Sequence, residues 1–127
     1  MTNLTISTTV AQEVTSPALE ARAGQITATS LQVAEHFGKR HPDVLRAIRK
    51  LEVSEEFSRC NFAPRDYFDE RGKVQPMYDI TRDGFAMLAM GFTGKEAARW
   101  KEAYISTFNA MEAKLRALYV SPLLSQN

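Results

Sequence analysis

Apolar residues at helical spacing predict a first short helix near residue 30. Leu31, Ala34 and Phe37 share one face of this helix. The helix begins with the sequence TSLQ, whose first residue is Thr29. This is a capping-box sequence, in which a threonine hydroxyl and a glutamine amide satisfy backbone groups at a helix start. Gly38 is expected to end the helix, because glycine readily adopts the left-handed conformation found after helix ends.

A second helix is predicted to run from Pro42 to about Leu51. Proline suits the first helical position, since its fixed φ matches a helix and its missing N–H has no partner there. The apolar face consists of Val44, Leu45, Ile48 and Leu51. The opposite side carries Arg46, Arg49 and Lys50.

Three positions favour a helix-turn-helix, a motif whose second helix enters the major groove of DNA. Ala34 supplies a small residue where the helices cross, Gly38 supplies the turn, and Val44 supplies the packing contact between the helices.

Residues 57–80 change to a strand-like pattern. The segments FSRCNF, DYF and VQPMYDI are rich in aromatic and β-forming residues, and DERGK, which contains Gly72, reads as a turn. They predict a small hairpin or a three-stranded sheet. Pro76 cannot donate to a strand ladder, so its strand is expected at an edge or with a bulge.

The C-terminal third is predicted to be helical. Thr81 caps a short, mostly buried helix in RDGFAMLAMGF, and a second capping box, TGKE at residues 93–96, opens a long helix. Apolar residues of the long helix recur at spacings of four and three, as in a helix seam that packs on a partner. The seam, predicted as a dimerisation surface, consists of Tyr104, Phe108, Met111, Leu115 and Leu118.

These patterns predict an α+β fold in four parts. Residues 1–25, rich in Thr, Ser and Ala, are expected to be a flexible leader, with a short strand at Leu4, Ile6 and Thr8 left open. Residues 26–92 are expected to form a winged-helix-like helix-turn-helix domain with a small β-hairpin wing. Residues 93–120 form the long C-terminal helix, and residues 121–127 form a flexible tail.

Composition narrows the choice of partner. The chain of 127 residues has 16 basic and 15 acidic residues, a formal net charge of +1, so an anionic partner has to be met by a local patch. The single cysteine, Cys60, cannot form an intrachain disulfide, which indicates a reducing, cytoplasmic compartment. No apolar run approaches the roughly 18 residues of a membrane helix, so no membrane partner is expected.

A local basic patch is present around the second predicted helix. Lys39, Arg40 and His41 surround its N-terminus, where the helix dipole also attracts phosphate, and only Asp43 opposes the cations of this region. The alternative is that these are solvated charges on an amphipathic helix. The complete set of predicted DNA contacts, with three cations assigned to the wing, is Lys39, Arg40, His41, Arg46, Arg49, Lys50, Arg65, Arg71 and Lys73.

The long seam has two interpretations that are compatible. In the first, the seam joins two copies of the chain. In the second, Trp100, Tyr104 and Phe108 pack on the chain's own core. A homodimer predicts two recognition helices about 34 Å apart, or a multiple of that, and a two-fold symmetric DNA site.

The sequence does not favour an enzyme. His36 and His41 lie on opposite sides of a turn, Cys60 has no base nearby in sequence, and no glycine-rich phosphate loop is present. No catalytic residue, metal site or cofactor is therefore predicted.

Two long segments resemble the phage regulatory protein Rha family of temperate bacteriophages and prophages. They are TSLQVAEHFGKRHPDVLRAIRKL and YFDERGKVQPMYDITRDGFAMLAMGFTGKEAARWKEAYISTFNAMEAKL, and the resemblance covers about residues 29–115, with TRDGF followed by MGFTG as the most specific part. It implies a phage or prophage regulator with a winged-helix-like DNA-binding region, acting in the bacterial cytoplasm.

The family pattern GK.H..VLR.I is matched from Gly38 to Ile48, so the resemblance assigns DNA contacts to its polar positions. Ala47 stands where relatives often carry an acid, which makes this face more cationic here.

We therefore expect a dimeric, sequence-specific regulator that binds double-stranded DNA through its second helix. The rival hypothesis is a protein-interaction module, such as an anti-repressor or host-factor antagonist, whose basic face meets another phage or host regulator.

Overall fold

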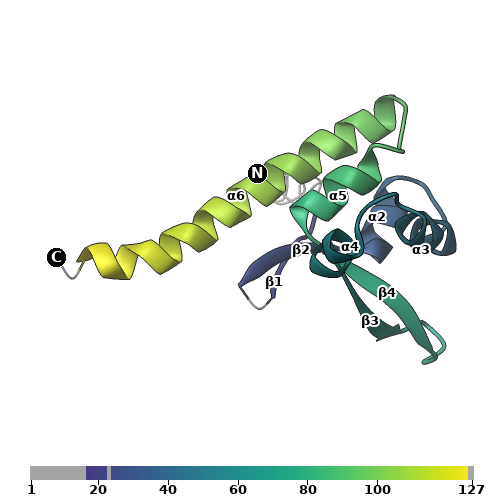
Figure 1. Ribbon diagram of the computed structural model, residues 1–127, viewed down its shortest axis with the longest axis horizontal. Helices are drawn as coiled ribbons and strands as arrows, with labels where there is room; N and C mark the ends of the chain where they lie inside the picture. Colours follow the sequence, from purple (N-terminus) through teal and green to yellow (C-terminus); the bar gives the residue numbers. More distant parts are fainter. Residues whose placement is uncertain (1–16, 23, 126–127) are drawn as a thin grey trace, which may run out of the picture.

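A computed structural model describes residues 17–22 and 24–125, with side chains described up to residue 118 except at residue 22 (Figure 1). Within this part the fold is α+β, as predicted, and contains five helices and an antiparallel sheet of four strands. In chain order the elements are β1 (Glu20–Arg22), β2 (Gln25–Thr29), α2 (Ser30–His36), α3 (His41–Arg49), α4 (Glu55–Asn61), β3 (Phe62–Phe68), β4 (Val74–Ile80), α5 (Arg82–Ala89) and α6 (Lys95–Ser125).

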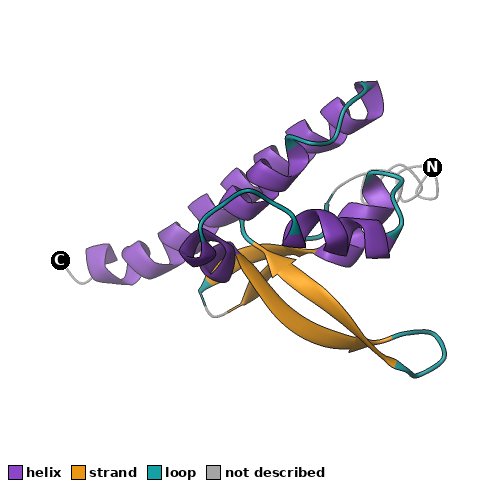
Figure 2. Cartoon of the chain, turned by 45° about the vertical axis from the view of Figure 1, so that its right-hand side comes forward, coloured by secondary structure: helices purple, strands orange, loops and turns teal. Residues whose placement is uncertain are grey.

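The sheet has the strand order β1-β2-β4-β3, and its longest part is the β3–β4 hairpin. The hairpin strands pair from Phe62 with Ile80 to Phe68 with Val74. Strand β2 joins β4 at only two residue pairs, next to Ile80. The outer part of the hairpin therefore has no third strand beside it in the described chain (Figure 2).

Pro76 lies in this outer part, where it pairs with Asp66 of β3 and lies beyond the two pairs that join β2 to β4. The prediction that its strand is an edge strand or has a bulge is wrong, because β4 is an inner strand between β2 and β3 and pairs with β3 in regular register. The missing N–H of Pro76 leaves no gap in the ladder between β2 and β4.

The hydrophobic core lies between the sheet and the helices. Its largest fully buried side chains are Tyr104, Phe85 and Phe108, and the rings of Phe85 and Tyr104 stack with centroids 4.5 Å apart. Burial of such rings provides much of the stability of a small domain, at about 25 cal/mol per Å² of apolar surface. The first turns of α6 are therefore part of this chain's own core.

His36 joins the end of α2 to α6. Its ring stacks on Trp100 with centroids 4.0 Å apart and planes 4° apart, and its Nδ1 lies 2.7 Å from the hydroxyl of Tyr104. Burial lowers the pKa of His36, an effect that the nearby Glu35 carboxylate partly offsets. Burial also raises the pKa of Tyr104 far above its ordinary value. The contact is therefore one between neutral groups at neutral pH.

The TRDGF motif forms the corner between β4 and α5. Thr81 accepts a hydrogen bond from the Gly84 N–H at 3.1 Å, as predicted for the cap, and its own hydroxyl donates to Asn61 Oδ1 at 2.6 Å. A Cβ at Gly84 would lie 2.7 Å from the carbonyl oxygen of Asn61. This close approach requires glycine.

Sequence reasoning erred at residues 57–61, which form most of α4 and not a strand. Ser54 caps this helix by accepting from the Phe57 N–H at 3.1 Å, and Glu55 and Glu56 lie in its first turn, where acids favour a helix. The Ser54 cap and the acids of the first turn therefore favour a helix more strongly than the aromatic residues favour a strand. Only from Phe62 onward is the expected strand present.

Other boundaries also differ from the prediction. Helix α3 ends at Arg49, before Leu51, and α6 starts at Lys95, so Gly94 and not Thr93 directly precedes it. Strand β1 and the first residue of β2 occupy positions that sequence reasoning assigned to the leader. Residues 1–16, including the alternation at positions 4 to 8, lie outside the described residues.

Helix α6 has 31 residues, a length of about 46 Å at 1.5 Å per residue. It continues to Ser125, into the residues predicted to be a flexible tail. Figure 1 shows its C-terminal half extending well past the sheet, away from α2 and α3. No helix among the described residues has the length and apolar character needed to cross a membrane.

Candidate nucleic-acid interface

The candidate interface starts at the turn between α2 and α3. Gly38 adopts the left-handed conformation, with φ of 64°, and the Lys39 N–H donates to the Ala34 carbonyl at 2.8 Å. Helix α2 begins with the predicted capping box, in which Thr29 and Gln32 each bind the other's backbone. The cap predicted from TSLQ and the turn predicted at Gly38 are thus confirmed.

Helix α3 has one buried and one exposed side. Val44, Leu45 and Ile48 are buried, which fixes the rotation of the helix about its axis. The cations predicted on the other side, Arg46, Arg49 and Lys50, are all exposed. The buried and exposed sides of α3 are thus the ones that the amphipathic sequence pattern predicted.

Two further cations lie before the helix. Arg40, the residue preceding α3, is exposed. Lys39 is also exposed, and its Nζ lies over the ring of Phe92, 4.9 Å from the centroid. A surface cation–π contact of this kind is worth about 0.5–1 kcal/mol, so it orients the lysine without holding it strongly.

One acid opposes this group of cations at close range. Arg46 forms a 2.8 Å ion pair with Asp43, and both side chains are largely exposed to solvent. Such surface pairs contribute about 0–1 kcal/mol, so the guanidinium remains available to a stronger anion. The patch formed by Lys39, Arg40, Arg46, Arg49 and Lys50, called here the α3 basic face, is therefore net cationic.

His41 does not belong to this face, contrary to the prediction. Its Nε2 lies 2.9 Å from Oγ of the fully buried Ser30, and its ring contacts Tyr67 edge to face. Burial lowers the pKa of His41, which keeps the ring neutral near pH 7. The sequence placed His41 beside the helix start correctly, but its side chain is directed toward the sheet.

Arg65 also differs from the prediction, because it lies in the middle of β3 and not near the hairpin tip. Its guanidinium forms a 2.7 Å hydrogen-bonded ion pair with Asp79 of β4 and lies 3.8 Å from Glu20 of β1. These contacts bind the strands together, so Arg65 has a structural role here.

The remaining wing cations, Arg71 and Lys73, are exposed at the hairpin turn. The turn is held by Asp69, whose carboxylate accepts from the N–H groups of both residues at 2.9 Å and from the Gln75 side chain at 3.1 Å. These hydrogen bonds hold the pKa of Asp69 below its ordinary value. The turn therefore carries anionic as well as cationic side chains.

The predicted dimerisation residues divide into two groups. Tyr104 and Phe108 are fully buried in the chain's own core, so a partner has no access to them. Met111 and Leu115 are half-buried beside Ala21 and Ile26, and Leu118 is 66% exposed. The surface that a second chain can reach is thus the ridge of Met111, Leu115 and Leu118.

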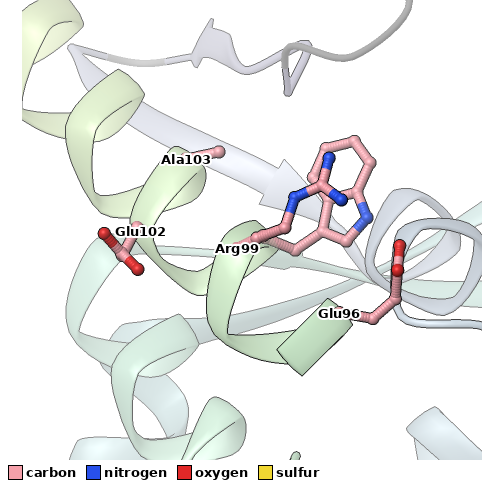
Figure 3. Close-up of a pocket in the computed structure, with 5 residues that line it drawn as sticks. Glu96, Arg99, Glu102 and Ala103 are labelled. Atoms are coloured by element: carbon pink, nitrogen blue, oxygen red, sulfur yellow. The ribbon is translucent and has the colours of Figure 1, made fainter. Parts of the chain in front are cut away.

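A depression lies on the first turns of α6. Its lining residues are Glu96, Arg99, Trp100, Glu102 and Ala103. Figure 3 shows the carboxylates of Glu96 and Glu102 pointing to different sides of the helix and not toward a common point. In the described part of the chain no three His, Cys, Asp or Glu residues are grouped so that they would hold a metal ion.

Comparison with known proteins places the chain in a family. The model of the phage regulatory protein Rha family matches residues 28–113, and the chain therefore belongs to that family. This confirms the resemblance noted in the sequence. No solved structure matches the chain significantly.

Three relatives illustrate the family. A 22.8 kDa protein encoded between gp15 and gp3 of Salmonella phage P22 is 44% identical over 99 residues, which cover 76% of this chain and 49% of the relative. An uncharacterized Haemophilus influenzae protein is 39% identical over 72% of this chain and 55% of its own length. The Bacillus subtilis protein named "SPbeta prophage-derived putative antirepressor protein YoqD" is 36% identical over 74% of this chain and 39% of its own length. The chain thus spans about half the length of the curated relatives it matches.

Proposed function

We propose that this protein is a sequence-specific DNA-binding regulator of a temperate phage or prophage, acting as a dimer in the cytoplasm of the bacterial host. The observation that carries the proposal is the α3 basic face, whose five exposed cations lie on α3 or directly before and after it, while the other side of the helix is buried. Phosphate contacts by lysine and arginine supply affinity, whereas side chains along the helix reach the base edges.

The order of the elements supports this proposal. Helices α2 and α3, joined by a glycine turn, follow β2, the short α4 separates them from the β3–β4 hairpin, and the three strands lie in the order β2-β4-β3. This is the arrangement expected of a winged helix-turn-helix. We infer that Arg46, Arg49 and Lys50 face the major groove, while Lys39 and Arg40 bind phosphates at the start of α3.

The hairpin is expected to contribute less to DNA binding than α3. Arg71 and Lys73 are close to Glu70 and Asp66 along the hairpin, so this end of the hairpin has little net positive charge. We retain the two cations as weak phosphate contacts. His41 and Arg65 are excluded from the proposed contacts because their side chains are bound to Ser30 and Asp79.

For the dimer, we propose pairing through the ridge of Met111, Leu115 and Leu118. These residues continue the spacing of Tyr104 and Phe108 beyond the core, and heptad spacing is typical of helices that pair along a seam. A two-fold dimer would bind two half-sites about 34 Å apart or at a multiple of that spacing.

The direct experiment selects DNA fragments of the host and phage genomes on the purified protein. Enrichment of a two-fold symmetric motif, lost in the Arg46→Ala, Arg49→Ala double variant, is the expected result. Recovery of fragments without a common motif would contradict sequence-specific binding.

A second candidate is a module that binds another protein regulator. It is favoured by an apolar surface on the hairpin, which contains the exposed Phe68 and Val74, and is consistent with the printed name of the Bacillus subtilis relative. In that case the same selection would enrich no motif, and the protein would bind a purified phage repressor instead.

A further inference from the structure

Asp43 is the one acidic residue of α3, and its side chain lies among the cations of the exposed side. Arg46 and Lys50 follow it at spacings of three and seven residues, which places all three on one stripe of the helix surface. In the proposed complex this stripe faces DNA, whose phosphates repel a carboxylate. The role of an acid at this position is therefore a question for the structure.

The contact of Asp43 with Arg46 answers it in part. Oδ1 of Asp43 accepts a 2.8 Å hydrogen bond from Nη1 of Arg46. The helix dipole favours an acid in the first turn of α3, but it does not account for this contact. An exposed ion pair adds little stability in water. Its larger effect is on the position of the guanidinium group.

The hydrogen bond leaves one edge of the Arg46 guanidinium free. The pair with Asp43 engages Nη1, and no acceptor among the described residues binds Nε or Nη2. These two nitrogens lie side by side and present parallel N–H groups in one plane. Such a donor pair matches O6 and N7 of guanine, the commonest base contact of arginine in the major groove.

Asp43 also restricts a side chain that packing does not hold. The Arg46 side chain is 58% exposed, so in solution it has many rotamers to choose from. Immobilising a long side chain on binding lowers affinity by about threefold to tenfold. The ion pair orders Arg46 before DNA arrives, and it strengthens when the groove excludes water. The gain applies only to the base that Arg46 contacts.

We propose that Asp43 is a specificity-determining residue of α3. Its carboxylate positions Arg46 so that Nε and Nη2 bind O6 and N7 of one guanine in each half-site. Asp43 acts through Arg46 and contacts no base itself. This inference rests on the proposed DNA-binding function and adds to it the identity of one base.

The test repeats the fragment selection with Asp43→Ala and Asp43→Asn, and then measures affinity for the selected site with each base at the position where Arg46→Ala abolishes the preference. Guanine should be preferred there by the unsubstituted chain, and 7-deazaguanine, which lacks the N7 acceptor, should lose most of the advantage. In Asp43→Ala the preference should fall by about threefold to tenfold. In Asp43→Asn it should be largely kept, because the amide oxygen still accepts from Nη1.

The effect of charge is controlled separately. Asp43→Ala and Asp43→Asn each remove one negative charge, so both should bind unrelated DNA more tightly, and by the same factor. Glu52→Ala is the matched control, because Glu52 is an exposed acid three residues beyond the end of α3. It should also bind unrelated DNA more tightly, with its guanine preference unchanged.

A double variant tests whether Asp43 acts through Arg46. Asp43→Ala added to Arg46→Ala should leave the base preferences of Arg46→Ala as they are. A further change would show that Asp43 contacts a base itself, and it would overturn the proposal. A motif whose guanine preference survives in Asp43→Ala, or falls equally in Asp43→Asn, would overturn this inference alone. A selection without any enriched motif would overturn the proposed function as well, so the two failures give different results.

Discussion

The hydroxyl of Ser30, at the first residue of α2, lies 2.9 Å from Nε2 of His41, at the first residue of α3. The same hydroxyl accepts a 2.9 Å hydrogen bond from the Tyr78 N–H of β4. One buried oxygen therefore connects the starts of both helices to the sheet. Because the α3 basic face begins at Lys39, two residues before His41, this contact sets the position of the cations relative to the hairpin.

Replacing Ser30 with alanine should destabilise the fold by about 1–3 kcal/mol. The change leaves the Tyr78 N–H and the His41 ring without their partner inside the protein, and the cost of an unsatisfied buried group lies in this range. Urea unfolding followed by circular dichroism measures the difference. Ser106→Ala, at an exposed position of α6, is the control and should change the free energy of unfolding by less than about 0.5 kcal/mol.

Gly84→Ala should also destabilise the protein, by about 1–3 kcal/mol, because the new Cβ would lie 2.7 Å from the Asn61 carbonyl and force α5 and α4 apart. Gly91→Ala is a matched control, since a Cβ there meets its nearest neighbour at an ordinary 3.7 Å. Thermal unfolding of the two variants gives the comparison. Equal unfolding midpoints for the two variants would mean that the corner formed by TRDGF tolerates a side chain at Gly84.

Stability should fall as the pH drops below about 6.5, the ordinary pKa of histidine. Burial lowers the pKa of both His36 and His41, so the unfolded chain binds more protons than the folded chain between that value and the lowered folded-state pKa. The stability that the two neutral histidines contribute is complete above the pKa that histidine has in the unfolded chain. It is lost as the pH falls below that pKa. His36→Gln should flatten the dependence of the free energy of unfolding on pH in this window, and an unchanged slope would show that His36 is not the group responsible.

Two substitutions on α6 separate its core from its proposed dimer surface. Leu118→Ser should reduce self-association in sedimentation experiments while leaving the unfolding midpoint nearly unchanged, because Leu118 is mostly exposed. Phe108→Ala should cost about 3–5 kcal/mol of stability at any protein concentration, because that ring is fully buried. If Leu118→Ser left the association unchanged, the pairing surface would lie elsewhere.

Local signals with a strong physical cause could be predicted from the sequence. The capping box at Thr29, the turn at Gly38 and the buried side of α3 are all determined by residues close together in the chain. The side-chain direction of His41 could not be predicted, because its partners, Ser30 and Tyr67, lie on other elements. The same holds for Arg65, whose partner Asp79 lies on another strand.

The exposed residues Pro64, Asp66 and Phe68 of β3 show a different limitation. The alternation of Pro64, Asp66 and Phe68 was available in the sequence as a signal that these residues share a face. Which face of the hairpin the helices cover depends on the packing of the entire domain, and alternation alone assigns the apolar side to the interior. The structure reverses that assignment for the outer part of the hairpin.

The salt dependence of DNA binding tests the central claim about the α3 basic face most directly. With Lys39 and Arg40 of each protomer bound to phosphates, the logarithm of the binding constant should fall with the logarithm of salt concentration with a slope of about −2 per protomer, made steeper by the weak contacts of Arg71 and Lys73. The Arg46→Ala, Arg49→Ala double variant should keep most of this slope but lose about 1–3 kcal/mol of affinity per residue for the selected site, because the two residues are proposed to face the bases. A slope near zero, or a double variant that binds as tightly as the unsubstituted protein, would contradict the assignment of this face to DNA.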